Sequence, residues 1–401
     1  MELRLPSPRR VNVMYALVQM TYWSLFAAFS GYQTALLLGR GFSSGQAGVF
    51  TAIRCLAGIF AQPLLGGWAD RHPEVSLNRL LNSCLSAALA VNVLFYRTRP
   101  GFAGTALIFV VLGVLELNAY PLLDSMAVQF INVGLDVNYS LGRGLGSFAY
   151  AVTCVIMGRQ AAALGVETVL VTHGALLVVL IGLIAVYPRL PGEVRRPPAE
   201  TEPPHSVREI VTSSPAFTWM LAAVFFALAA VMPIVGFMVN IITGRGGTET
   251  HLGWALFLMG ASELPAALLF PHLWRRLGSQ GMMGLAVIFM AVKPLCFALA
   301  PSLGWVLAVQ PIQMLGYGLF TPANVYFANE NVAPEDRAQG QSLKTVLTNS
   351  MGSLTGTLIS GLIIDWGGIR AMLVFCIASG CVGLLFGIAA VRARRSAQNA
   401  R

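Results

Sequence analysis

Long apolar runs, separated by short polar breaks, follow one another along almost the whole chain. Each run is close to the roughly 20 residues that a helix needs to cross the hydrocarbon core of a bilayer. A helix satisfies its own backbone hydrogen bonds there, so helices are expected. The pattern predicts an all-α membrane protein with twelve spanning helices, at residues 12–38, 47–69, 78–97, 103–127, 139–163, 167–187, 216–243, 251–274, 281–300, 303–329, 338–364 and 368–391.

A polar stretch near the middle divides these helices into two sets of six. Residues Pro188–Glu209 are rich in proline and charge and cannot form a packed core. The segment GRGFSSGQAG from Gly39 also returns as GRGGTETHLG from Gly244. The same offset relates Gly31 to Gly236, Arg40 to Arg245, Gly41 to Gly246, and Gly48 to Gly253. We therefore expect two pseudo-symmetric six-helix bundles, residues 1–187 and 216–401, joined by a cytoplasmic linker at 188–215.

Composition agrees with a bilayer as the solvent. Of the 401 residues 56% are apolar and 11% are charged, against roughly 25% charged in an average soluble domain. The net charge of +9 comes from basic residues spread over short loops, which argues against a nucleic-acid partner. If both termini are in the cytoplasm, most of these basic residues lie on the cytoplasmic side of the membrane. The expected location is a bacterial-type inner membrane, with several passes and both termini cytoplasmic.

Eight charged residues lie within or at the ends of the predicted spans, where a charge is costly and needs a reason. They are Arg54, Glu116, Asp124, Arg143, Glu263, Lys293, Glu330 and Lys344. Structural salt bridges would explain them, and so would a substrate or ion pathway. Glu330 and Lys344 flank a cytoplasmic loop, which favours a structural role for those two. Glu116, Glu263 and Lys293 lie deep within their spans and are better candidates for function.

The break between the second and third helices reads GGWADRHPEVSLNR, from Gly66 to Arg79. It resembles the loop signature of the major facilitator superfamily, with Asp70 and Arg71 at the matching positions. The resemblance implies that this acid–arginine pair gates the cytoplasmic face by charge pairing. An ordinary charged loop is the alternative reading. The second half has PHLWRRLG at the corresponding place, without an acid, so the signature is one-sided.

The fourth and fifth helices carry a closer resemblance. PLLD ends at Asp124, and YSLGRGLGSFAY runs from Tyr139 to Tyr150. These segments are similar to the lactose permease branch of the superfamily, the oligosaccharide, nucleoside and phenylpropionate proton symporters. The resemblance implies that Asp124 and Arg143 bind substrate hydroxyls while Tyr150 stacks on a ring. Arg143 and Tyr150 are nearly two turns apart and share a helix face. A salt bridge beside a packing tyrosine is the alternative.

The same resemblance extends to the eighth, ninth and tenth helices. Glu263 in ASELP stands at the place of a glutamate that links substrate and proton, and Lys293 stands where that branch has an arginine. On the tenth helix the branch has a histidine and a proton-carrying glutamate, whereas this chain has Gln313 and Gly316, which cannot titrate. Proton coupling is therefore expected at Glu263, with Lys293 as its partner, or at Glu116.

Arg54 on the second helix either pairs with Glu116 or adds a cation for an anionic substrate. We favour the pair for Arg54 and a functional role for Glu116.

The sequence thus predicts a secondary transporter, a proton-coupled symporter that imports a sugar, nucleoside or aromatic acid by alternating access. A proton-driven exporter of a drug or metabolite and a non-transporting solute sensor are the alternatives. No P-loop, metal cluster or Ser-His-Asp set is present in the sequence, so we expect neither an enzyme nor a cofactor. The expected partners are the lipid bilayer, a small-molecule substrate and a proton, and the expected state is a monomer.

Overall fold

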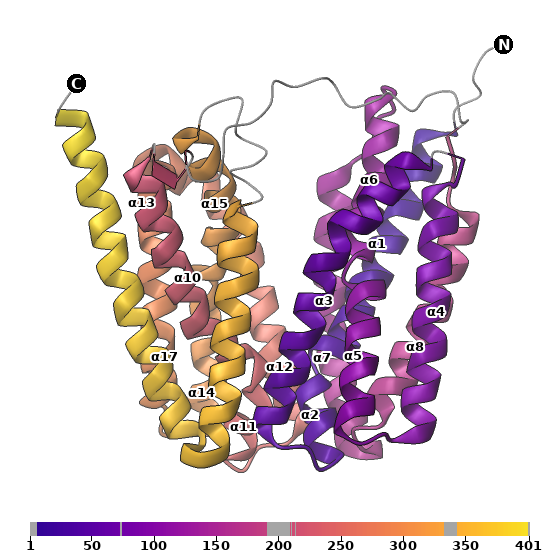
Figure 1. Ribbon diagram of the computed structural model, residues 1–401, viewed down its shortest axis with the longest axis horizontal. Coiled ribbons are helices and arrows are strands. Elements are labelled where there is room, and N and C mark those ends of the chain that lie inside the picture. Colours follow the sequence, from indigo (N-terminus) through magenta and orange to yellow (C-terminus); the bar gives the residue numbers. More distant parts are fainter. Residues whose placement is uncertain are drawn as a thin grey trace. The chain divides into compact units, whose positions relative to one another are not determined.

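The computed structural model describes residues 6–72, 74–190, 209, 211–212, 214–332 and 343–399 (Figure 1). Within these ranges the regular secondary structure is helical throughout, and the predicted fold class is confirmed. The chain divides into two compact units. Unit 1 contains residues 1–42 and 50–198, and unit 2 contains residues 43–49 and 199–401. The first turns of the second spanning helix thus group with unit 2, and most of the predicted linker lies outside the described residues.

Unit 1 is built from the helices of the first half of the chain. They are α1 (Pro8–Ser30), α2 (Gln33–Gly39), α3 (Ser44–Arg71), α4 (Leu77–Thr98), α5 (Phe102–Glu116), α6 (Ala119–Asn132), α7 (Tyr139–Leu164) and α8 (Thr168–Val186). Helix α1 packs along α7 and α8, and α4 packs along α8. Helices α5 and α6 together replace the single predicted fourth helix. The chain is interrupted at Asn118, whose side chain donates a hydrogen bond to the Val114 carbonyl at 2.7 Å.

Unit 2 contains the helices of the second half. They are α10 (Pro215–Gly236), α11 (Met238–Thr243), α12 (Glu249–Ala261), α13 (Glu263–Ala298), α14 (Leu303–Val309), the 3-10 helix η2 (Gln310–Met314), α15 (Tyr317–Asn331), the π-helix η4 (Thr345–Gly352) and α17 (Ser353–Asn399). Helix α10 packs along α17, and α13 packs on α15 and α17. Helices α13 and α17 each reverse at a glycine with positive φ, Gly278 and Gly368, so each contains two consecutive helical segments.

The tenth predicted helix is also not continuous. Residues 303–329 form α14, η2 and α15, because the proline at position 311 has no backbone N–H to donate and Gly316 leaves helical geometry at φ −85°, ψ −98°. Among the described residues, nine helical segments are long and apolar enough to cross a membrane. Dividing α13 at Gly278 and α17 at Gly368, joining α12 to the first segment of α13, and adding α1 accounts for the twelve predicted spans.

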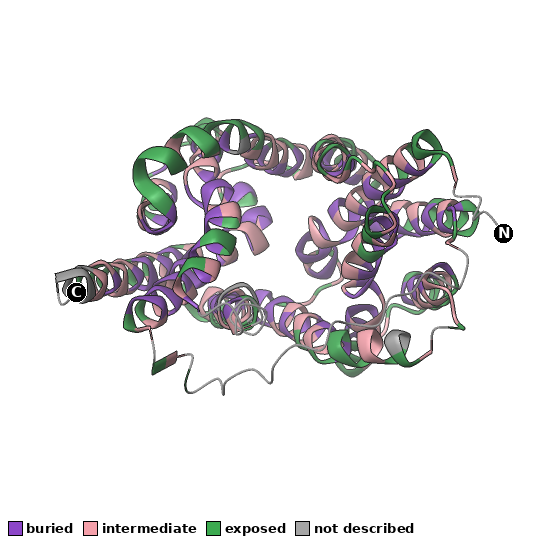
Figure 2. Ribbon diagram, turned by 90° about the horizontal axis from the view of Figure 1, so that it is seen from above, coloured by how far each residue is buried: buried purple, intermediate pink, exposed green. Residues whose placement is uncertain are grey.

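Burial follows the pattern expected in lipid. Buried residues gather where helices of the same unit pack together, while outward faces are exposed (Figure 2). Many exposed residues are large and apolar, among them Leu64, Leu268 and Trp366, with 73%, 83% and 79% of their surface exposed. In water such surfaces would drive aggregation, but next to acyl chains they carry no cost.

The internal repeat of the sequence has a structural counterpart in each unit. Gly41 and Gly246 both have left-handed φ values, 87° and 74°, which favour glycine. Beside them, Arg40 donates to the Phe95 carbonyl at 3.1 Å, and Arg245 donates to the Phe297 carbonyl at 3.0 Å. The same turn and the same arginine cap therefore occur in both halves.

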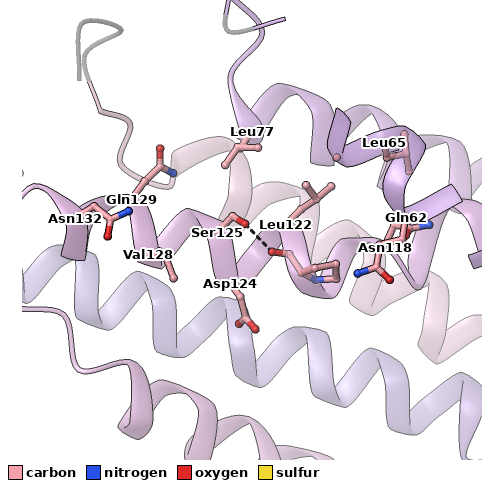
Figure 3. Close-up of a pocket in the computed structure, with 12 residues that line it drawn as sticks. Gln62, Leu65, Leu77, Asn118, Leu122, Asp124, Ser125, Val128, Gln129 and Asn132 are labelled. Atoms are coloured by element: carbon pink, nitrogen blue, oxygen red, sulfur yellow. Dashed lines mark hydrogen bonds between the residues drawn. The ribbon is translucent and has the colours of Figure 1, made fainter. Parts of the chain in front are cut away.

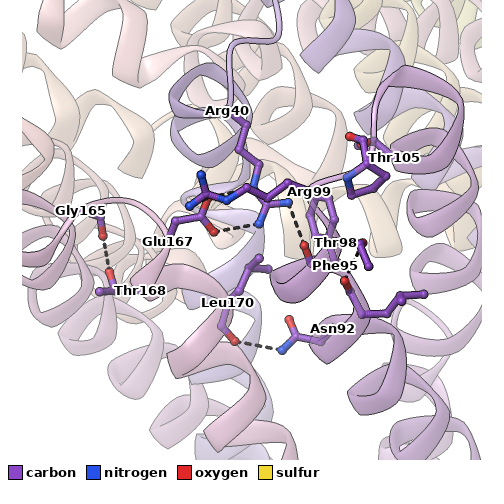
Figure 4. A network of polar contacts seen from close by, with 12 residues as sticks. Arg40, Asn92, Phe95, Thr98, Arg99, Thr105, Gly165, Glu167, Thr168 and Leu170 are labelled. Atoms are coloured by element: carbon purple, nitrogen blue, oxygen red, sulfur yellow. Dashed lines mark hydrogen bonds and ion pairs between the residues drawn. The ribbon is translucent and has the colours of Figure 1, made fainter.

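In unit 1 the repeated arginine is held further by an acid. Glu167 accepts two hydrogen bonds from Arg40, at 3.0 and 2.8 Å, and lies 3.4 Å from Arg99 (Figure 4). A bidentate contact of this kind fixes the guanidinium plane and ties the end of α2 to the start of α8.

Candidate functional site

A stripe of polar and aromatic side chains follows one face of α1. Tyr15, Gln19 and Trp23 are spaced by four residues, so their side chains lie along one side of the helix. The Gln19 amide joins its neighbours: it donates to the Tyr15 hydroxyl at 3.0 Å and accepts from the Trp23 indole at 3.1 Å. Gly142 and Gly146 of α7 make this possible, because a Cβ at either position would lie 2.5 Å from the Tyr15 or Trp23 ring.

Asp124 on α6 meets this stripe. Its carboxylate accepts hydrogen bonds from the Gln19 amide at 3.0 Å and from the Tyr15 hydroxyl at 3.3 Å. Asp124 also lines a cavity of about 550 Å³ between α3, α4 and α6 (Figure 3). The other polar residues of that cavity are Gln62, Asn118, Ser125, Gln129 and Asn132. Asp124 is therefore anchored by α1 and lies at the edge of a space lined with amide and hydroxyl groups.

Arg143 on α7 contacts the stripe at Trp23. Its guanidinium carbon is 4.0 Å from the centre of the Trp23 ring and 5.9 Å from that of Tyr120. Its Nη1 donates to the Ser147 hydroxyl at 2.8 Å. A guanidinium stacked on an indole is attracted by the ring's negative face and keeps its edge donors for other acceptors.

Aromatic rings complete the cluster. Tyr150 packs on Trp23 with ring centres 6.5 Å apart, and Tyr120 lies 5.6 Å from Trp23 at a steep angle. Phe26 is 5.6 Å from Trp23 and 6.4 Å from Tyr150. We call Tyr15, Gln19, Trp23, Tyr120, Asp124, Arg143 and Tyr150 the α1 cluster.

The structure thus brings three predicted site residues, Asp124, Arg143 and Tyr150, to one cluster of unit 1. In the described part of the chain, Asp124 and Arg143 form no ion pair with each other, and both are held by neutral partners. Sequence reasoning missed the α1 residues that join them. The four-residue spacing of Tyr15, Gln19 and Trp23 was the available signal.

The remaining predicted residues lie elsewhere. Lys293 is 1% exposed in unit 2, donates to Gln313 at 2.7 Å and interacts electrostatically with Glu263. Gln313, which stands where the resembling branch has a histidine, therefore contacts Lys293, which stands where that branch has an arginine. Arg71 is exposed at the end of α3, and the Asp70 side chain lies outside the described part of the structure.

Arg54 and Glu116 form the predicted pair in unit 1, with Nη2 and Oε2 2.9 Å apart. A third titratable residue, His173 on α8, lies 3.2 Å from the other carboxylate oxygen. Little in the pattern of residues indicates His173, because one histidine in an apolar helix resembles an ordinary core residue.

Three comparisons with known proteins bear on this arrangement. The MFS_1 like family model matches residues 12–375. A maltose permease of Geobacillus stearothermophilus is 25% identical over 389 residues, which cover 96% of this chain and 95% of the permease. A putative sugar efflux transporter of Deinococcus radiodurans is 24% identical over 355 residues, covering 83% of this chain and 85% of that protein.

Among solved structures, the nucleoside transporter NupG is similar, with a TM-score of 0.77 at 15% identity. The match covers 96% of this chain and 98% of NupG, and at that identity it shows the fold. The family model spans most of the chain and the helices follow the fold of these transporters. This chain therefore belongs to the MFS_1 like family and is a multi-pass membrane transporter of the major facilitator superfamily.

Proposed function

We propose that this transporter imports a sugar together with a proton, and that the α1 cluster binds the sugar. The observation that carries the proposal is that Asp124 and Arg143 both contact the polar and aromatic face of α1, through Gln19 and Trp23, without an ion pair between them among the described residues. A carboxylate accepts hydrogen bonds from sugar hydroxyls, and a guanidinium donates to sugar oxygens. Trp23 and Tyr150 offer flat apolar faces for the C–H side of a pyranose ring.

The similarity to a maltose permease favours a sugar over a nucleoside or an aromatic acid as the first substrate to test. The amide-rich cavity beside Asp124 supports the same choice, since hydroxyl groups need many hydrogen-bond partners.

Coupling to protons belongs to the same proposal. Glu263 with Lys293 in unit 2, and Glu116 in unit 1, are the proposed proton-binding residues, because an acid in the membrane interior is the kind of group that can carry a proton during transport. The proposed setting is a bacterial inner membrane with both termini cytoplasmic and a monomeric protein. Asp70 and Arg71 are proposed to gate the cytoplasmic face.

Export is the second candidate, since one similar protein is described as a putative sugar efflux transporter. The binding chemistry would be the same and the direction would differ. Uptake by right-side-out vesicles with an acidic exterior supports import, whereas uptake by inside-out vesicles with an acidic interior supports export.

Binding is tested by thermal unfolding of the purified protein with maltose, uridine or phenylpropionate. A bound ligand raises the unfolding temperature by mass action. We expect maltose to raise it, and we expect both Arg143→Ala and Arg143→Lys to lose the effect, because an ammonium does not reproduce the planar fork of donors.

Arg159→Ala is the matched control, as Arg159 lies on the same helix but is exposed. A maltose shift that survives Arg143→Ala would rule out the α1 cluster as the sugar site. A shift with uridine or phenylpropionate and none with maltose would overturn the choice of substrate.

A further inference from the structure

Three titratable side chains of unit 1 meet in a buried cluster beside the α1 cluster. Arg54 on α3, Glu116 at the end of α5 and His173 on α8 are 5%, 2% and 0% exposed. Glu116 stands between the other two: one carboxylate oxygen is 2.9 Å from Arg54 Nη2, and the other is 3.2 Å from His173 Nε2. Among the described residues, neither that second oxygen nor Nε2 makes a hydrogen bond elsewhere.

Asn92 on α4 fixes which ring nitrogen of His173 carries a hydrogen. Its amide nitrogen donates to the Leu170 carbonyl at 2.9 Å, so its oxygen faces His173 Nδ1 at 2.9 Å and can only accept. The reverse amide orientation would place two carbonyl oxygens against each other. His173 Nδ1 therefore carries a hydrogen, and the state of Nε2 is decided by Glu116.

One hydrogen must then lie between Glu116 Oε1 and His173 Nε2. Without it, the lone pairs of two acceptors would face each other in a buried space, which costs free energy. With it, the pair is either a carboxylate beside an imidazolium or a carboxylic acid beside a neutral imidazole. Both forms contain the same number of protons, so the pair binds one proton as a unit.

The other groups around the pair are neutral or fixed in charge. Arg54 is held by Ser30 at 2.9 Å and by Gln33 at 3.2 Å, and lies over the Phe29 ring at 4.7 Å. Phe29 also packs on His173, with ring centres 4.9 Å apart. From α1, Tyr22 contributes a buried, neutral phenol. Helix α4 contributes the neutral Asn92.

We propose that Glu116 and His173 form a single proton-binding site inside unit 1 and that its proton is coupled to transport. The coupling rests on the proposed function, whereas the proton site itself does not. Because both groups are buried, the proton exchanges with water only when the surrounding helices move. Helix α1 contacts both sites, because Phe29 packs on His173 and Tyr22 stacks on Tyr120 of the α1 cluster with ring centres 6.0 Å apart.

Infrared difference spectra of the purified full-length protein, recorded between acidic and alkaline buffer, test the site. We expect carboxyl and imidazole bands that titrate together and that both disappear in Glu116→Gln and in His173→Gln, because the two groups share one proton. Glu74→Gln removes half of an exposed His–Glu pair, His72 and Glu74 at 2.8 Å, and should leave those bands in place.

If each variant loses only the band of the substituted group, the two groups titrate independently and the shared site is wrong. Spectra of the variants that match the wild type would also overturn the shared site. Either variant alone gives this answer if the other fails to fold, and size-exclusion profiles check folding.

Proteoliposomes with radiolabelled maltose test the coupling. In His173→Gln we expect accumulation driven by a pH gradient to fall by about tenfold or more, while maltose exchange without a gradient stays within about twofold. Gradient-driven accumulation at the wild-type level in a variant that has lost the shared bands would overturn the coupling. A wild-type protein that moves no maltose would instead contradict the proposed function, and the spectra would still decide the proton site.

Discussion

At the scale of single residues, Trp23 is the centre of the proposed sugar site. It contacts the Arg143 guanidinium, the Tyr150 and Tyr120 rings and the Gln19 amide at once. An indole that holds a cation on its face orients the guanidinium edge without neutralising its charge. This explains how an arginine can remain available for a ligand in the interior of a membrane protein.

We predict that Trp23→Leu weakens maltose binding by about tenfold, close to 1.4 kcal/mol, because it removes both the stacking face and the support of Arg143. Isothermal titration calorimetry of the purified protein measures the change. Trp305→Leu serves as the control, since Trp305 is 50% exposed in unit 2. Equal affinities in Trp23→Leu and the wild type would show that the ring takes no part in binding.

Residue-level prediction from the sequence was uneven for physical reasons. Short motifs along single helices predict Asp124, Arg143 and Tyr150 as site residues. Gln19 and His173 act through contacts between helices, at separations of 105 and 81 residues from Asp124 and Asn92. Helical periodicity does not encode which faces meet, so such contacts could not be derived from the sequence.

At the scale of elements, the close approach of α1 and α7 forms the site. Gly142 and Gly146 leave room for the Tyr15 and Trp23 rings, whereas Gly144, on the same helix, has open space where a Cβ would be. Small residues at a helix contact are the usual means of bringing membrane helices together.

Gly142→Ala should therefore destabilise the protein by about 1–3 kcal/mol, because its methyl group would overlap Tyr15. Gly144→Ala should leave stability unchanged or raise it by about 0.4–1 kcal/mol, since alanine restricts the unfolded chain and meets no neighbour. Thermal unfolding of the two variants side by side gives the comparison. Equal loss in both would mean that α1 and α7 do not pack as described.

The elements themselves were largely predictable, because a span needs a fixed length of apolar sequence. The breaks were not. The fourth predicted helix ends at Glu116 and resumes at Ala119, beside the side-chain hydrogen bond of Asn118. The tenth passes through η2, which contains a proline. Neither feature lowers the hydropathy of the sequence, so neither break is visible in the apolar pattern. Glu116 owes its position at a helix end to one of these breaks.

At the scale of the whole molecule, unit 1 contains both a proposed sugar site and a proposed proton site. The lactose permease branch, by resemblance, has its proton-carrying acid on the tenth helix, where this chain has Gln313 and Gly316. Lys293 donates to the Gln313 side chain there, and the amide cannot take up a proton in the way that a histidine or glutamate would. A proton site at Glu116 and His173 would place coupling and binding in the same bundle.

The central claim, that this protein moves a sugar through the α1 cluster, is tested most directly by counterflow in proteoliposomes. Vesicles loaded with unlabelled maltose are diluted into radiolabelled maltose, and entry of label is followed without any pH gradient. We predict rapid exchange by the wild type, a loss of about tenfold or more in Asp124→Asn, and wild-type exchange in Asp136→Asn, whose side chain is exposed in a loop. Entry no faster than in protein-free vesicles, or unchanged exchange in Asp124→Asn, would contradict the claim.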